Sequence, residues 1–137
     1  MASTRIIKIR QLDIDIIPPS TRSMYNRDQG GSKIVVIGKP GTGKTTLITS
    51  LLYEKRNIFP IGLVMSGTED SNGHYKQIFP STFVYNKLIE NKITDFISRQ
   101  KIAKKHLTNP WAVLLLDDCT DDPKLFNKPL FHSLYKN

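Results

Sequence analysis

One stretch constrains the fold of this chain more than any other: residues 34–47, which read IVVIGKPGTGKTTL. Within it, Gly38–Thr45 (GKPGTGKT) matches the phosphate-loop pattern G-x-x-x-x-G-K-[ST], and the β-branched run before it predicts a buried strand over 33–37. A helix is expected from Lys44 to about Lys55. The backbone N–H groups of the loop and the amino end of this helix would face one phosphate together. The stretch therefore predicts a nucleoside triphosphate site.

The loop pattern also assigns roles to individual residues. Lys44 is expected to reach the β- and γ-phosphates and to act in catalysis, and the Thr45 hydroxyl is expected to bind Mg²⁺. ATP and Mg²⁺ are thus the expected ligands. The full set of expected nucleotide-binding residues is Gly38, Lys39, Pro40, Gly41, Thr42, Gly43, Lys44, Thr45 and Thr46.

A second stretch, WAVLLLDDC at 111–119, ends an apolar run in two acids. Acids that end parallel strands lie at the carboxyl edge of the sheet, where ligands of open α/β folds bind. Asp117 is the expected metal residue, and Asp118 is the expected general base that polarises the attacking water. An alternative for Asp117 is that it caps the next turn. Many ATPases carry a glutamate at the position of Asp118, and aspartate is one methylene shorter. Asp118 must therefore approach the attacking water more closely or act through a second water.

Further polar residues are expected at the same edge of the sheet. Ser66, Thr68 and Glu69 follow another apolar run, so one of them could sense the γ-phosphate; an ordinary turn is the alternative. Cys119 is expected to be a small buried residue. Since it is the only cysteine, no intrachain disulfide can form, and a reducing compartment is the simple interpretation.

Apolar runs alternate with segments of helical spacing along the whole chain. We expect strands at 61–65, 82–85 and 111–116, a long helix at about 87–107, and a last helix that Asp122 caps and Pro123 opens. This order predicts an α/β fold, a P-loop NTPase three-layer sandwich with a parallel sheet. Residues 1–32 are expected to form a short amino-terminal β segment and a linker, and residues 33–137 the ATPase core.

The charge of the chain favours a polyanionic partner. The formal net charge is +8. In the expected long helix, Lys101, Lys104 and Lys105 share one helical face. This lysine triplet suits non-specific contact with the phosphates of duplex DNA; a solvated helix surface is the alternative. No apolar run is long enough to span a membrane, and the start of the chain lacks the pattern of a secretion signal.

The sequence motifs of other classes of phosphate-loop protein match this chain less well. A GTPase needs Asn-Lys-x-Asp after a strand, whereas Asn127–Leu130 reads NKPL. A transporter-type ATPase would carry an LSGGQ-like stretch, which the chain lacks. A nucleotide kinase usually shows an arginine-rich lid, and the only arginines after the loop are Arg56 and Arg99. A small-molecule kinase stays open as an alternative.

Several stretches together resemble the DNA-packaging ATPases of large nucleocytoplasmic DNA viruses, a branch of the HerA/FtsK translocases that includes the poxvirus packaging ATPase. They are GKPGTGKTTLI, IGLVMSGTEDSNGHY, TFVYN, the RQK of residues 99–101, and LLLDDC. Viral ATPases of this kind commonly carry Asp-Asp where cellular relatives carry Asp-Glu, which supports Asp118 as the base. The resemblance implies a ring-forming motor that uses ATP to thread duplex DNA into a capsid. It implies action in the host cytoplasm or the virion, with capsid or portal proteins as further partners.

The chain departs from this superfamily at its carboxyl end. In members of the superfamily, the strand that lies between the phosphate-loop strand and the acidic strand comes later in the sequence, and an arginine finger follows it. In this chain, no obvious strand lies between Asp118 and Asn137. The expected core is therefore partial, with an empty central slot in the sheet. A nucleotide-binding or interaction module without turnover is a further alternative. None of the arginines can be nominated as the finger: Arg5, Arg10, Arg22, Arg27, Arg56 or Arg99.

Overall fold

A parallel β-sheet forms the centre of the molecule. The computed structural model describes residues 33–119 and 122–136, so the amino-terminal β segment predicted within residues 1–32 lies outside the described residues. Strands β1 (Ile61–Ser66), β2 (Val84–Tyr85) and β3 (Ala112–Asp117) lie in the order β2-β1-β3, and β1 runs parallel to both neighbours. The last residues of β1 and β3, Ser66 and Asp117, lie opposite each other, so both strands end at one edge.

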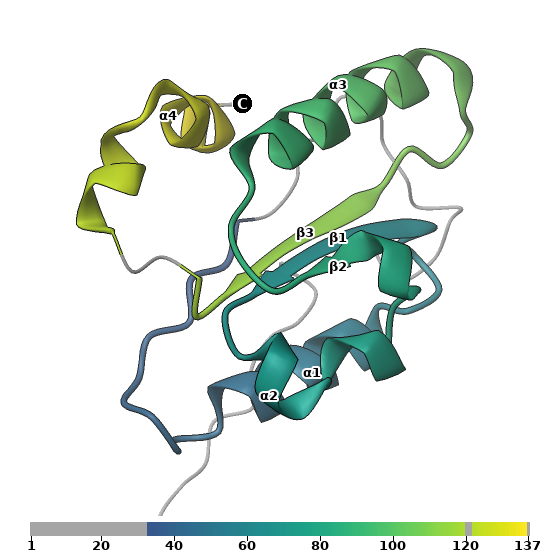
Figure 1. Cartoon of the computed structure of the whole chain (residues 1–137). Coiled ribbons are helices and arrows are strands. Elements are labelled where there is room, and N and C mark those ends of the chain that lie inside the picture. Colours follow the sequence, from purple (N-terminus) through teal and green to yellow (C-terminus); the bar gives the residue numbers. More distant parts are fainter. Residues whose placement is uncertain (1–32, 120–121, 137) are drawn as a thin grey trace, which may run out of the picture.

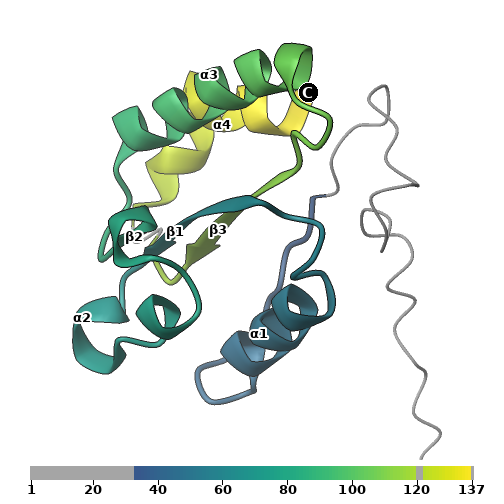
Figure 2. The same ribbon diagram turned by 90° about the vertical axis from the view of Figure 1, so that its right-hand side faces the viewer.

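Helices cover both faces of this sheet. Helices α1 (Lys44–Glu54) and α2 (Glu69–Asn72) lie on one face, and α3 (Glu90–His106) and α4 (Pro129–Lys136) lie on the other (Figures 1 and 2). The arrangement is a three-layer α/β/α sandwich. The predicted α/β class, parallel sheet, first helix and long third helix are confirmed.

The alternation of side chains along β1 divides the core between the two faces. Leu63 and Met65 pack with Ile93 of α3 and with Cys119. On the other face, Val64 packs with Tyr75 and with Val84 of β2. Cys119 is buried, as its small apolar character predicted.

Three short 3₁₀ segments connect these elements: Tyr75–Gln77, Ser81–Phe83 and Pro123–Asn127. The predicted strand at 82–85 is therefore a 3₁₀ turn followed by only two paired residues. Asp122 caps the last 3₁₀ segment as predicted, because its Oδ1 accepts a hydrogen bond from the backbone N–H of Lys124 at 2.9 Å. The α-helix itself begins only at Pro129, since Pro129 interrupts the predicted helix.

The prediction of a buried strand at 33–37 was wrong for the described structure. This run has no strand assignment, and Ile34, Val35 and Ile37 are 53%, 66% and 91% exposed. A strand needs a neighbour with which to form a ladder, and among the described residues β3 pairs only with β1. Among the described residues, the outer edge of β3 therefore has no strand partner, and α1 itself has no buried residue.

Candidate nucleotide site

The glycine loop adopts the left-handed turns that its sequence predicts. Gly41 and Gly43 have φ angles of 76° and 89°, a region that residues with a Cβ rarely adopt. A Cβ on Gly38 would lie 2.6 Å from the Thr42 hydroxyl oxygen, because the loop folds tightly on itself. The turns at Gly41 and Gly43 therefore favour glycine, and a Cβ on Gly38 would force the Thr42 side chain to move.

The loop ends where α1 begins and presents donors there. Gly43 is the N-cap of α1, and its carbonyl accepts the first intrahelical bond, from the Leu47 N–H at 2.9 Å. The N–H groups of Lys44, Thr45 and Thr46 precede this bond, so they lack intrahelical acceptors. The amino end of α1 therefore has the donors and the dipole that bind an anion.

The side chains of the loop fold back over its backbone. The Lys44 ammonium donates to the Gly38 carbonyl at 2.5 Å, and the Thr42 hydroxyl donates to the Lys39 carbonyl at 2.7 Å. Lys39 and Pro40 are exposed at the bend of the loop. The Lys44 ammonium thus lies against the backbone at the start of the loop, within the turn that is predicted to hold a phosphate.

The predicted metal residue reaches the phosphate loop. Asp117 ends β3, and its Oδ2 accepts a hydrogen bond from the Thr45 hydroxyl at 3.3 Å, although the two residues lie 72 positions apart. The carboxylate therefore points across the edge of the sheet to the start of α1. This geometry does not match the alternative in which Asp117 caps the turn that follows it.

Tyr75 also belongs to the site, although no motif in the sequence predicts it. Its hydroxyl donates to Asp117 Oδ2 at 2.6 Å, and the residue is only 1% exposed. Burial raises the pKa of the Tyr75 phenol well above its usual range, and the hydrogen bond to Asp117 and the negative charge of that residue act in the same direction. Tyr75 is therefore a protonated donor at neutral pH.

Glu69 stabilises the turn that carries Tyr75. It is 2% exposed, and its two carboxylate oxygens accept the backbone N–H groups of Tyr75 and Lys76, each at 3.0 Å. Its carboxylate therefore matches the ordinary-turn alternative. Ser66 and Thr68 lie within hydrogen-bonding distance of each other through their hydroxyl oxygens, 3.2 Å apart.

Asp118 lies at the same edge in a strained conformation. Its φ angle is 47°, and its side chain is exposed. Gly67 permits this conformation, because a Cβ there would lie 2.0 Å from the Asp118 carbonyl oxygen. Within the described part of the chain, the Asp118 carboxylate forms no hydrogen bond. Strained backbone of this kind is concentrated at functional sites.

The donor set at the loop fits a magnesium ion. Among the described residues, no three His, Cys, Asp or Glu side chains come together in a way that could hold a metal ion. Mg²⁺ in nucleotide sites needs no such group, because one or two protein oxygens act together with phosphate oxygens and water. The Thr45 hydroxyl and the Asp117 carboxylate are hard oxygen donors and already lie together.

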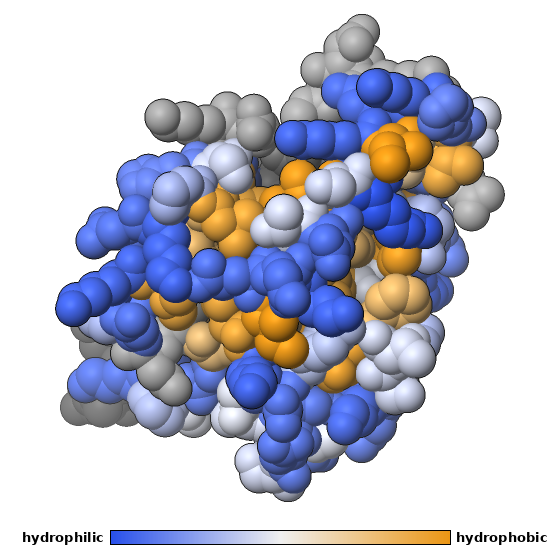
Figure 3. Space-filling model, turned by 45° about the horizontal axis from the view of Figure 1, so that its top comes forward, coloured by the Kyte–Doolittle hydropathy of each residue, from blue (hydrophilic) through white to orange (hydrophobic). Residues whose placement is uncertain are grey.

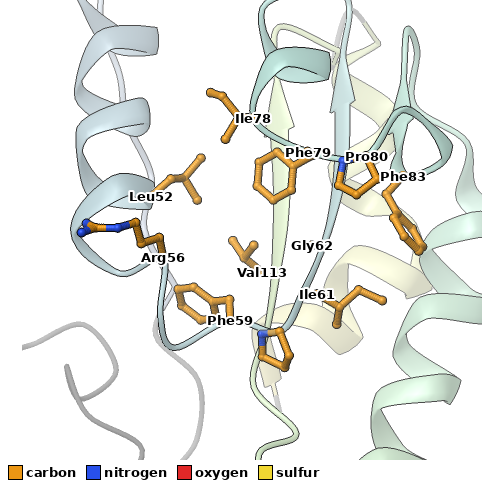
Figure 4. Close-up of a pocket in the computed structure, with 11 residues that line it drawn as sticks. Leu52, Arg56, Phe59, Ile61, Gly62, Ile78, Phe79, Pro80, Phe83 and Val113 are labelled. Carbon is orange, nitrogen blue, oxygen red and sulfur yellow. The ribbon is translucent and has the colours of Figure 1, made fainter.

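An apolar hollow of about 250 Å³ lies at the opposite edge of the sheet (Figure 4). It adjoins Ile61 and Gly62, which open β1, whereas the acids follow the other ends of the strands. Leu52 of α1 and Arg56, in the turn after this helix, lie on one side of the hollow, with Phe79 across from them. The hollow is therefore separate from the candidate nucleotide site.

The lysine triplet lies on the outer side of α3. All three lysines are exposed, as are Lys92 and Arg99. The acid at the start of this helix, Glu90, forms an ion pair with Lys128. Hydrophilic side chains dominate the view from this side, with hydrophobic ones between them (Figure 3). The basic residues of α3 thus form a solvent-facing surface. In the described residues, no helix is long and apolar enough to cross a membrane.

The chain is similar to proteins of iridescent viruses. It is 52% identical over 138 aligned positions to Uncharacterized protein 075L of Invertebrate iridescent virus 6, and this alignment covers 100% of this chain and 53% of the relative. Uncharacterized protein 088R of Invertebrate iridescent virus 3 is 45% identical over 131 positions, 96% of this chain and 50% of the relative. The chain thus spans about half the length of these curated relatives. No family model matches it, and no solved structure does.

A bacterial protein gives a further match. GTPase Der of Buchnera aphidicola is 36% identical over 120 positions, 80% of this chain but only 25% of the relative. The segment that comes nearest to a guanine-reading motif, Asn127–Leu130, ends a 3₁₀ segment and starts α4. It follows no strand and lacks the final aspartate, so the structure offers no support for guanine recognition at this segment.

Proposed function

We propose that this chain is the ATP-binding and hydrolysing core of a viral motor that packages duplex DNA into a capsid. The observation that carries the ATPase part is the contact between Thr45 and Asp117. A threonine after a phosphate loop and an acid at a strand end meet in this way where a nucleoside triphosphate and its metal bind.

Each residue of the site has a role in this proposal. The loop N–H groups and the Lys44 ammonium bind the β- and γ-phosphates, and Thr45 and Asp117 hold Mg²⁺. The bound ion would neutralise the charge that develops on the transferred phosphoryl group. Asp118 orients and polarises the attacking water, and its exposed carboxylate is available for that role.

The packaging part of the proposal rests on the resemblance and on the viral relatives. The SGTE stretch and the paired aspartates are the more specific motifs, and proteins of two iridescent viruses are 52% and 45% identical to this chain over nearly all of its length. The exposed lysine triplet would contact duplex phosphates without reading sequence. Copies of the full-length protein would form a ring, with capsid or portal proteins as partners, in the host cytoplasm or the virion.

Steady-state ATP hydrolysis, measured while duplex DNA is added at low salt, tests this function. We expect turnover that rises with DNA and disappears in Asp118→Asn, which keeps the size of the side chain and suits the left-handed backbone. Asp95→Asn changes the charge equally on the exposed surface of α3 and should hydrolyse ATP normally. Turnover that survives in Asp118→Asn would contradict the role of that residue. Phosphate transfer to a nucleoside would indicate a kinase instead.

A specific observation also favours binding without turnover. The run at 33–37 has no strand assignment, its residues Ile34, Val35 and Ile37 are exposed, and α1 has no buried residue, so among the described residues little packing supports the phosphate loop from that side. A loop held loosely can bind phosphate and yet fail to orient it for attack. ATP binding with no hydrolysis at any DNA concentration would support this second function.

A further inference from the structure

We propose that Tyr75 is a positioning residue for Asp117, which it holds in the orientation that reaches the phosphate loop. This inference rests on the proposed function, because it concerns how the same site holds its metal. Tyr75 lies 42 positions before Asp117 in the chain, and its hydroxyl donates to Asp117 Oδ2 at 2.6 Å. That distance is typical of a strong hydrogen bond from a hydroxyl to a carboxylate.

Two donors meet on a single oxygen of Asp117. Oδ2 accepts from Tyr75 and from the Thr45 hydroxyl, at 2.6 Å and 3.3 Å. In the described part of the chain, both hydrogen bonds to this carboxylate go to Oδ2. The pair of bonds fixes the rotation of the carboxylate group, so Oδ1 stays available for the ligand.

Tyr75 is itself fixed on several sides. Its ring packs in the cluster with Val64 and Val84 and lies edge-on to the His74 ring, with the ring centres 5.0 Å apart. Its backbone N–H is bound by the buried Glu69 carboxylate at 3.0 Å. A donor with so little freedom can impose its geometry on a half-buried carboxylate at the end of a strand.

This arrangement has a consequence that packing alone would not produce. Groups that orient a metal-binding side chain change metal affinity when they are removed, while the ligands themselves remain. Tyr75→Phe deletes only the hydroxyl and leaves the ring in its cluster. The variant should therefore need more Mg²⁺ for tight ATP binding, and its affinity for ATP without Mg²⁺ should not change.

Equilibrium binding of a fluorescent ATP analogue, titrated with MgCl₂, measures this effect on the full chain. We expect Tyr75→Phe to raise the Mg²⁺ concentration for half-maximal tightening about 10-fold, the lower end of the range for partners that orient metal ligands. Tyr53→Phe is the matched control, because Tyr53 is 62% exposed and its ring stacks on Arg56. Urea unfolding of both variants verifies that each is folded.

A double substitution shows whether the effect passes through Asp117. In an Asp117→Asn background, Tyr75→Phe should add nothing to the Mg²⁺ requirement; additive effects would overturn the proposal. A Tyr75→Phe chain that matches Tyr53→Phe would overturn it as well, while the proposed function would stand. If the unsubstituted chain binds no ATP analogue at any Mg²⁺ concentration, the proposed function fails, and the role of Tyr75 fails with it.

Discussion

Gly67 is where a single methyl group should disturb the whole edge of the sheet. It follows β1, and its N–H donates to the Asp117 carbonyl at 3.1 Å. An added Cβ would lie 2.0 Å from the Asp118 carbonyl oxygen, a backbone atom that cannot rotate away. Gly67→Ala must therefore push the ends of β1 and β3 apart, and the two acids move with them.

The expected loss follows from these contacts. Overpacking of this kind destabilises by about 1–3 kcal/mol, and loss of the backbone hydrogen bond adds about 1 kcal/mol. We expect Gly67→Ala to lower the free energy of unfolding by about 2–4 kcal/mol. ATP binding should weaken too, because the Asp117 carboxylate would no longer meet the Thr45 hydroxyl.

Urea unfolding and fluorescent ATP binding test both expectations. Gly73→Ala is the control: Gly73 has a φ angle of 58°, but an added Cβ there would meet no atom within 4 Å. The control should lose only the stability that the left-handed backbone costs a residue with a Cβ, about 1 kcal/mol, and should bind ATP normally. If Gly67→Ala unfolds like the control and binds ATP like the unsubstituted chain, the close approach of these strand ends is wrong.

Three further predictions concern buried and charged groups. Glu69→Gln places an amide donor against a backbone donor, so it should destabilise by about 2–3 kcal/mol in urea unfolding, whereas Glu54→Gln on the exposed side of α1 should have little effect; equal losses would contradict the role of Glu69. Because burial raises the pKa of Tyr75, its contribution to stability is complete below about pH 10 and falls as the pH rises further. Unfolding midpoints from about pH 8 to about pH 11 should therefore fall less steeply in Tyr75→Phe than in Tyr53→Phe, and parallel curves would contradict this. Replacing the lysine triplet with alanine should flatten the salt dependence of duplex DNA binding by about 3 in log–log slope, measured by fluorescence anisotropy; an unchanged slope would indicate a merely solvated surface.

Local patterns predicted most of the regular structure. The apolar run 61–65 and the helical spacing over 87–107 gave β1 and α3 nearly residue by residue, since both depend on periodicity within one segment. The turns at Gly41 and Gly43 were equally predictable, because their backbone conformation admits little else. The wrong strand at 33–37 shows the limit: a β-branched run becomes a strand only beside a partner.

The site was only partly predictable for a related reason. Asp117 and Thr45 could be paired from motif order, because parallel strands end at one edge of a sheet. Tyr75 could not, because its role depends on a turn that Glu69 stabilises and on packing against two strands. No spacing rule joins it to Asp117. The left-handed backbone of Asp118 was also hidden, because an aspartate, unlike a glycine, does not mark a left-handed position in the sequence.

Calorimetric titration of ATP into this chain in the presence of Mg²⁺, with Lys44→Ala as the critical variant, decides whether the phosphate loop binds a nucleotide. Lys44 reaches over the loop, whereas Lys76 is exposed on the turn after α2, so Lys76→Ala removes the same charge elsewhere. Nucleotide binding by the phosphate loop predicts one ATP per chain, normal binding in Lys76→Ala and loss of binding in Lys44→Ala. Absence of binding in the unsubstituted chain, or equal binding in both variants, would contradict it.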